Sequence, residues 1–194
     1  KKSPLIISDN LKQFSYTIGL KGNVQRENAH IAEVVIKTLN PTFNETYIKQ
    51  GLKNVKWHGR NQIVQKQPLV IFDVAHNESG IASFINYYQL LAKGKKILII
   101  SLQSRKKITS QINAIVNTFD EIIICETKNK RTMTINELHS EFKHDLEVKC
   151  IKSDYDAINY ALNNADKNDS IGIIGTHFLG DAISKIFNIS FNLL

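Results

Sequence analysis

The sequence predicts an α/β fold with a doubly wound, mostly parallel sheet after Pro68. Five apolar runs of strand length, rich in Ile and Val and without polar alternation, indicate strands covered on both faces. They are LVIFDV, KILIISL, EIIICET, LEVKCI and SIGIIG, which begin at residues 69, 96, 121, 146 and 170. Segments of helical period separate the runs, and this alternation builds parallel sheets through right-handed crossovers. We therefore expect a Rossmann-like domain over residues 68–194.

Three apolar stripes predict helices between these strands, because their members recur every three or four residues. The stripes are Ile81, Phe84, Ile85, Tyr88 and Leu91; then Ile135, Leu138 and Phe142; then Tyr155, Ile158, Ala161, Leu162 and Ala165.

The first 67 residues follow another pattern. FSYTIGL, residues 14–20, alternates like a strand, and residues 22–39 have the period of a helix. One face of that helix carries Val24, Asn28, Ile31, Ala32, Val35 and Leu39. A second short helix is expected within residues 42–55, beginning at a Thr or Asn cap. One strand and two helices do not complete a domain, so we expect residues 1–67 to be the end of a larger one.

The net charge of +7 is concentrated in this first part. Residues 1–67 hold 11 Lys and Arg against 4 Asp and Glu, whereas the rest holds 14 of each. The basic residues are scattered and not interleaved with aromatic ones, which favours a phosphorylated small molecule over nucleic acid. Without a long apolar run, a cytoplasmic protein is expected. Cys125 and Cys150 are interpreted as small buried side chains in a reducing compartment.

Polar residues follow the first predicted strand of the second domain. Asp73, His76 and Asn77 come at its carboxyl end, where open parallel sheets bind ligands. A carboxylate there can orient a hydroxyl or a metal-bound water, and a neutral imidazole can donate or accept one hydrogen bond. The alternative is structural: Asp73 or Asn77 caps the following helix and His76 is an incidental turn residue.

Four short motifs occur in order along the chain. GNVQRENAHIA at residues 22–32 resembles G-x-H-Q-x-x-N-A-x-x-A, and WHGRNQ at 57–62 resembles W-x-G-R-x-[EQ]. DVAHN at 73–77 resembles D-x-A-H-N, and GTHFLGDA at 175–182 resembles G-[ST]-x-[FY]-L. Together they are similar to the carboxyl-terminal half of the folylpolyglutamate synthase and dihydrofolate synthase family, within the Mur ligase superfamily. The sequence departs from that pattern at Val24, where His is common, and at residues 105–107, where Asp-Lys-Asp is frequent.

The resemblance implies a Mur ligase C-terminal domain at 68–194, preceded by the tail of a P-loop ATPase domain at 1–67. It implies an ATP-dependent ligase that adds L-glutamate to a folate or dihydropteroate carboxylate through an acyl phosphate, with Mg²⁺ as cofactor. No G-x-x-x-x-G-K-[ST] loop occurs in the sequence. We therefore expect a fragment that is inactive alone, with the metal ligands mainly in the other half. The alternative is a non-catalytic nucleotide-binding or regulatory domain.

The resemblance also implies roles for single residues. Asn28 would contact adenine, Arg60 would reach the phosphates, and Asp73 and His76 would contact the nucleotide, with Arg60, Asp73 and His76 forming the catalytic group. Thr176 would hold the incoming glutamate, and its alternative, a cap for the next helix, is equally good. No histidine spacing indicates a metal site. The expected partners of this monomer are ATP, L-glutamate and a folate or dihydropteroate, without nucleic acid or a membrane.

Overall fold

The computed structural model describes residues 5–7, 14–142 and 147–191. The chain divides into two compact units, Lys1–Trp57 and His58–Leu194. Each unit is described by itself.

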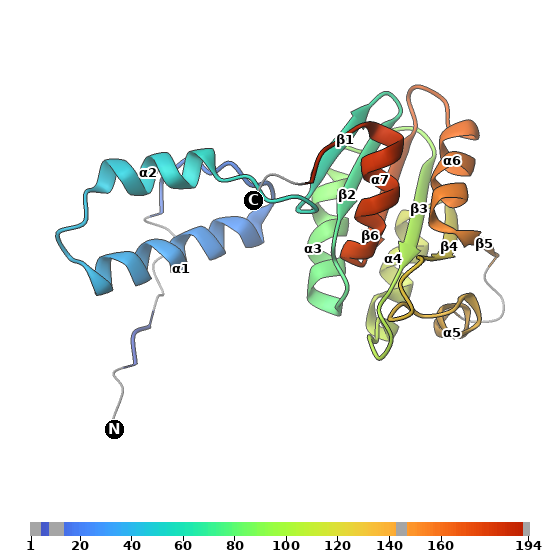
Figure 1. The fold of residues 1–194 in the computed structure, drawn as a ribbon, viewed down its shortest axis with the longest axis horizontal. Helices are drawn as coiled ribbons and strands as arrows, with labels where there is room; N and C mark the ends of the chain where they lie inside the picture. The colour runs from blue at the N-terminus through green and yellow to red at the C-terminus, as the bar shows by residue number, and fades with distance from the viewer. Residues whose placement is uncertain (1–4, 8–13, 143–146, 192–194) are drawn as a thin grey trace. The chain divides into compact units, whose positions relative to one another are not determined.

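The first unit contains the helices α1, Asn23–Leu39, and α2, Glu45–Asn54 (Figure 1). Asn44 caps α2, because its side chain accepts a hydrogen bond from the backbone N of Thr46 at 2.9 Å. Both predicted helices are confirmed. The strand predicted at residues 14–20 is wrong: this stretch is irregular, and the carbonyl of Phe14 instead accepts a hydrogen bond from Arg26. Residues that alternate like a strand form one only where another strand is available for pairing.

The apolar face of α1 is not covered within the first unit. No residue of this helix is buried. The exposed fractions are 40% for Val24, 53% for Ile31, 49% for Val35 and 81% for Leu39. Asn28, which shares this face, is exposed too.

The second unit is built on a six-stranded sheet in the order β1-β2-β6-β3-β4-β5. The strands are β1 Gln62–Lys66, β2 Leu69–Asp73, β3 Lys96–Ser101, β4 Glu121–Glu126, β5 Val148–Ser153 and β6 Ser170–Gly175. Only β1 is antiparallel to its neighbour; the other pairs are parallel. The predicted α/β fold with a mostly parallel sheet is therefore confirmed.

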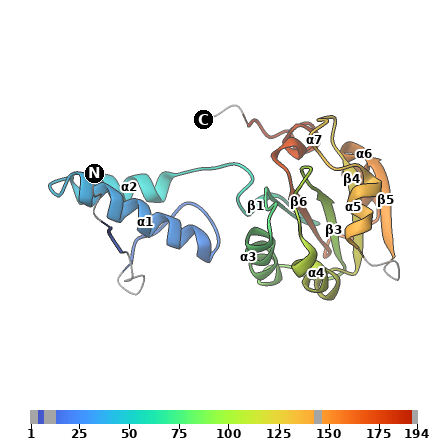
Figure 2. The same cartoon turned by 90° about the horizontal axis from the view of Figure 1, so that it is seen from below.

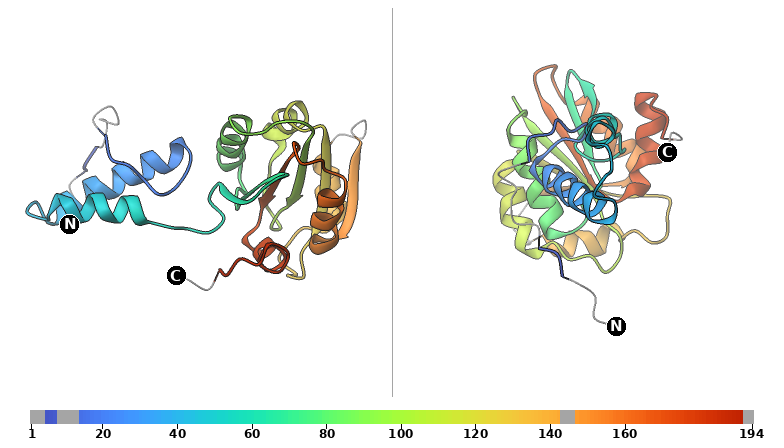
Figure 3. Two further views of the ribbon diagram at one scale, coloured as in Figure 1. Left: turned by 90° about the horizontal axis from the view of Figure 1, so that it is seen from above. Right: turned by 90° about the vertical axis from the view of Figure 1, so that its left-hand side faces the viewer.

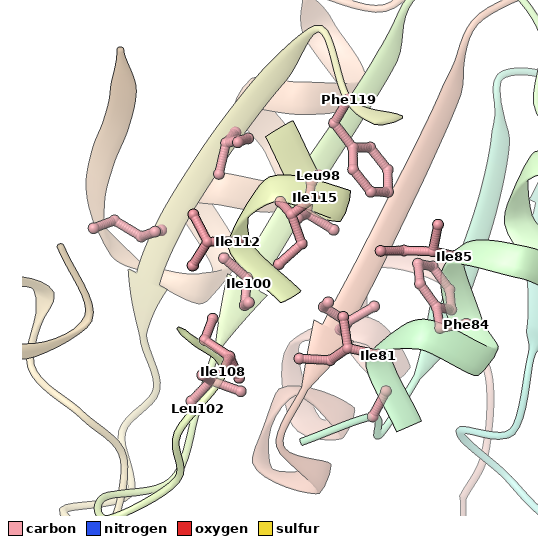
Figure 4. Packing of buried hydrophobic residues seen from close by; sticks show 14 of the residues in the cluster. Ile81, Phe84, Ile85, Leu98, Ile100, Leu102, Ile108, Ile112, Ile115 and Phe119 are labelled. Carbon is pink, nitrogen blue, oxygen red and sulfur yellow. The ribbon is translucent and has the colours of Figure 1, made fainter. Parts of the chain in front are cut away.

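Helices cover both faces of this sheet (Figures 2 and 3). They are α3 Glu78–Gln89, η2 Thr109–Gln111, α4 Ile112–Thr118 and α5 Ile135–Glu141 on one face, and α6 Asp154–Asn163, η3 His177–Leu179 and α7 Gly180–Phe187 on the other. On the first face, α3 and α4 bury Phe84 and Ile115 against Leu98 and Ile100 of β3 (Figure 4). On the second face, Ile158 and Ile183 are buried with Ile97, Ile99 and Ile173. Burial on both faces explains why β2, β3, β4 and β6 read as unbroken apolar runs.

Two expectations are changed by the second unit. Its first strand, β1, lies before Pro68 and pairs with β2 through a turn that contains a cis Gln67–Pro68 bond. The unit consequently begins at His58, earlier than the sequence boundary at Pro68. Cys125 is buried, which raises the pKa of its thiol, but Cys150 on the edge strand β5 is exposed, so its predicted burial is wrong.

Candidate functional site

Two motif segments meet at the carboxyl edge of the sheet. Strand β6 lies between β2 and β3 and runs parallel to both. Near its carboxyl end, Ile174 lies opposite Asp73 of β2, and Gly175 lies opposite Ser101 of β3. The segments that follow β2 and β6, residues 74–77 and 176–179, therefore emerge side by side. Ligands of open α/β sheets bind outside this edge.

The loop that carries Arg60 is folded onto the end of β2. The backbone N of Val74 donates a hydrogen bond to the carbonyl of Gly59 at 2.9 Å, and the N of Gly59 donates to Oε1 of Gln62 at 2.9 Å. Gly59 has φ +69°, and a Cβ there would lie 2.7 Å from Cγ1 of Val74. Only glycine allows this close approach without strain. The loop is therefore tightly packed at Gly59, whereas Trp57 is 52% exposed.

Asp73 is buried beneath this loop. Its Oδ2 accepts a hydrogen bond from the backbone N of Asn61 at 2.7 Å, and 6% of the residue is exposed. Burial raises the pKa of the Asp73 carboxyl to about 6, although the hydrogen bond from Asn61 and the nearby charge of Arg60 act in the opposite direction. Asp73 thus ties down the residue that follows Arg60 and does not cap α3. Asn61 itself has φ 44°, a left-handed conformation that Asn adopts more readily than most residues.

His76 and Asn77 have separate roles in the turn after β2. Nδ1 of His76 lies 2.8 Å from the carbonyl of Val74. Because a carbonyl can only accept, this nitrogen carries the proton, and in the neutral ring Nε2 is the acceptor. Asn77 caps α3 by accepting a hydrogen bond from the backbone N of Gly80 at 2.8 Å. The capping interpretation is therefore correct for Asn77.

Thr176 directly follows β6, beside the end of β3, and 1% of the residue is exposed. Its backbone N donates to the carbonyl of Ser101 at 2.9 Å, and its Oγ1 accepts from the backbone N of Phe178 at 3.2 Å. The hydroxyl thus caps η3, as one of the two interpretations predicted. Its predicted contact with glutamate stays a prediction.

The second unit brings four of the five predicted site residues to one edge: Arg60, Asp73, His76 and Thr176. Asn28 belongs to the first unit, where its side-chain nitrogen lies 3.4 Å from Oε1 of Gln25. Sequence reasoning assigned no role to Asn61 or Gln62, although Gln62 is part of the quoted WHGRNQ motif. Their signal was their position directly after Arg60 in that motif.

A cavity of about 280 Å³ opens farther along the same edge. Its lining residues are Thr127, Lys128, Asn129, Asp154, Phe178 and Asp181. Across the described ranges, no group of three or more His, Cys, Asp or Glu side chains could hold a metal ion. Within the same ranges, no helix combines the length and apolar character needed to cross a bilayer.

Residues 59–177 match the family model described as the Mur ligase, glutamate ligase domain. The chain therefore belongs to the Mur ligase family. Among curated members, a folylpolyglutamate synthase of Saccharomyces cerevisiae strain FostersO is 30% identical over an alignment of 152 residues, and the match covers 63% of this chain and 27% of the yeast protein. The corresponding protein of strain YJM789 is 31% identical over 134 residues, covering 55% of this chain and 24% of its own length.

Solved structures of folylpolyglutamate synthases share the fold. Mycobacterium tuberculosis folylpolyglutamate synthase complexed with ADP and AMPPCP has a TM-score of 0.76 at 20% identity, over 90% of this chain and 43% of that one. A bifunctional folylpolyglutamate and dihydrofolate synthase of Yersinia pestis, complexed with AMPPNP and a Mn ion, has a TM-score of 0.73 at 23% identity, over 84% of this chain and 39% of that one. The chain spans about a quarter of the curated relatives and about two fifths of the solved ones.

Proposed function

We propose that this chain is part of an ATP-dependent amide ligase that adds L-glutamate to a folate or dihydropteroate carboxylate. The observation that carries the proposal is the gathering of Arg60, Asp73, His76 and Thr176 at one sheet edge, within a domain of a glutamate ligase family. The names of the relatives support it, since they are folylpolyglutamate synthases. One bifunctional folylpolyglutamate and dihydrofolate synthase is described with Mn, AMPPNP and L-glutamate bound, and other relatives are described with ADP.

The proposed reaction has two steps. A carboxylate oxygen of the folate attacks the γ-phosphorus of ATP, and the bond from that phosphorus to ADP breaks. The amino group of glutamate then attacks the acyl carbon, the carbon–oxygen bond to phosphate breaks, and the amine loses a proton. Both steps move negative charge, so their catalysis depends on positioning and on fixed positive and hydrogen-bonding groups.

Arg60 is the residue of this chain best suited to stabilise the negative charge on the phosphate oxygens. A guanidinium offers a rigid fork of donors for phosphate oxygens. The hydrogen bonds at Gly59 and Asn61 fix the backbone on both sides of it, so little flexibility has to be lost when a phosphate binds. Bound Mg²⁺ would neutralise further phosphate charge, and its ligands are expected outside the described residues.

Three other residues are proposed to bind substrates. The acceptor Nε2 of His76 suits a hydroxyl of the nucleotide, and the Thr176 hydroxyl suits a carboxylate of glutamate. The amide of Asn28 can match the donor and acceptor edge of adenine. Under this proposal the first unit is the end of an ATPase domain and the second unit is the Mur ligase C-terminal domain. We also propose that the protein is a cytoplasmic monomer and that it acts in folate biosynthesis and one-carbon metabolism.

Two measurements test this function. The first is incorporation of labelled glutamate into dihydropteroate or folate, with equimolar ADP, by the longer polypeptide that contains this sequence. The 194-residue chain alone should show no ligation. The second uses substrate with ¹⁸O in its carboxylate, because an acyl phosphate must transfer one labelled oxygen to the released phosphate. Nucleotide binding without any amide formation would instead favour the alternative, a regulatory nucleotide-binding domain.

A further inference from the structure

The chain changes direction directly after α7. Asn188 ends the helix in a left-handed conformation, with φ 51° and ψ 46°. Two hydrogen bonds fix this turn: the backbone N of Ile189 donates to the carbonyl of Ser184 at 3.1 Å, and Oγ of Ser184 donates to the carbonyl of Ile189 at 2.6 Å. A left-handed residue after a helix is a common way to stop it and to redirect the chain. The direction of residues 188–191, which we call the tail segment, is therefore set by α7.

The tail segment reaches the loop that carries Arg60. The ring of Phe191 meets that of His58 edge-to-face, with 4.9 Å between the centroids and an interplanar angle of 77°. Its centroid also lies 6.3 Å from that of Phe72. Aromatic pairs at these distances attract one another. Phe191 thus contacts the residue two positions before Arg60.

Phe72 extends this contact to the next residue of the loop. A Cβ on Gly59 would lie 3.1 Å from Cε1 of Phe72, so the backbone of Gly59 packs against that ring. Phe72 itself is 2% exposed and cannot easily move. The two residues before Arg60 are therefore held by Phe191, His58 directly and Gly59 through Phe72.

The tail segment connects this loop to the core of the second unit. β1 is an edge strand that pairs with β2 alone, and loops beside sheet edges open at a lower free-energy cost than a core strand. Phe191 packs against the buried cluster that contains Leu179 and Ile183 of η3 and α7. A loop at the edge of the sheet thereby gains support from the helices that cover it.

We propose that the tail segment positions Arg60, with Phe191 as the residue that holds the loop. This inference rests on the proposed function, in which Arg60 binds phosphate, and adds to it a residue that touches no substrate. A loop that is ordered before a ligand arrives loses less conformational freedom on binding, so its affinity is higher. Without the Phe191 ring, the same guanidinium would sit on a more mobile loop.

Hydrogen exchange of single amides tests the loop in the 194-residue chain. The amides of Asn61 and Val74 report on it, since they donate to Asp73 and Gly59. Phe191→Ala should speed exchange at both about fivefold, as loss of a ring contact would. Phe191→Tyr keeps the ring and should exchange like wild type.

Phe187→Ala is the matched control. Phe187 packs against the same buried cluster and is the last residue of α7, before the tail segment begins. This variant should lower global stability, measured at the amide of Ile99 in the central strand β3, but leave local exchange at Asn61 and Val74 like wild type. Equal acceleration at those two amides by Phe187→Ala and Phe191→Ala would overturn the inference.

Titration of the longer polypeptide with ATP measures the consequence at Arg60. Phe191→Ala should weaken ATP binding about fivefold, whereas Phe191→Tyr and Phe187→Ala should bind like wild type. In an Arg60→Ala background, Phe191→Ala should weaken binding no further, because its effect passes through Arg60. An unchanged affinity in Phe191→Ala, or a full second loss in the double variant, would overturn the inference.

Ligation assays on the same proteins keep this inference separate from the proposed function. Ligation by wild type, combined with equal ATP affinities in all the Phe191 and Phe187 variants, would contradict the role of the tail segment alone. An ATP affinity that depends on the Phe191 ring, without any ligation, would contradict only the proposed ligase.

Discussion

Asp73 combines a structural advantage with an electrostatic cost. Its carboxyl fixes Asn61 beside Arg60, yet burial raises its pKa from 3.8 to about 6. In that window the folded protein binds more protons than the unfolded chain, so the free energy of unfolding falls as pH rises from about 4 to 6. Above pH 6 the ionised group costs roughly 3 kcal/mol relative to an unshifted carboxyl.

Asp73→Asn tests this cost directly. An amide oxygen still accepts the hydrogen bond from Asn61 but carries no charge. We expect the variant to be more stable than wild type at pH 7, with the advantage gone near pH 4, while ligase turnover of the longer polypeptide falls because the charge beside Arg60 is lost. Thermal unfolding at the two pH values and a turnover assay measure both effects. A variant that is less stable than wild type at pH 7 would show that the ionised carboxyl is a net stabiliser.

The conformation of the loop before β1 requires glycine at position 59, whereas helix α2 does not require the glycine at position 51. Gly59→Ala adds a Cβ at φ +69° and 2.7 Å from Val74, so we expect a loss of about 1–3 kcal/mol in unfolding free energy and reduced turnover. Gly51→Ala is the matched control, since no atom lies within 4 Å of a Cβ there. In a helix interior, Ala should add about 0.5–1 kcal/mol. Denaturant titration of both variants checks the contrast, which two equal changes would contradict.

Elements with strong local signals were predictable from the sequence, and those defined by distant pairing were not. The parallel strands β2, β3, β4 and β6 were found because burial on both faces requires unbroken apolar runs such as residues 97–100, whereas β5 is an edge strand without a buried residue. β1 was missed because its edge position allows the mixed sequence QIVQK. The loops after β3 and β4 meet through the hydrogen bond from Ser104 to Arg131, a contact between distant residues that no local pattern reveals.

Site residues divide in the same way. Asp73, His76 and Thr176 were predictable as polar residues after apolar strands, and the capping role of Asn77 follows from its place before α3. The hydrogen bonds that fix the backbone on both sides of Arg60 were not predictable, because they depend on the end of β2: Asn61 donates to Asp73, and Val74 donates to Gly59.

At the scale of the whole molecule, the division into two units predicts where a protease cuts. The segment from Val55 to Trp57 is exposed and outside any helix or strand. Residues 62–66, although close to the sequence boundary at Pro68, are paired with β2 in the sheet. Proteases need an extended, unpaired backbone, so trypsin should cut after Lys56 before it cuts after Lys66.

The second unit should survive that cut as the resistant product. It contains the complete sheet and both buried clusters, whereas α1 has no buried residue to protect it. Mass spectrometry of a tryptic time course should therefore show a product that begins at Trp57 and persists, while fragments of residues 1–56 are degraded. Lys66 is the internal control, because it is exposed like Lys56 but lies in a strand. First cleavage after Lys66, or persistence of the amino-terminal piece, would mean that β1 is not held in the sheet and that the boundary lies at Pro68 after all.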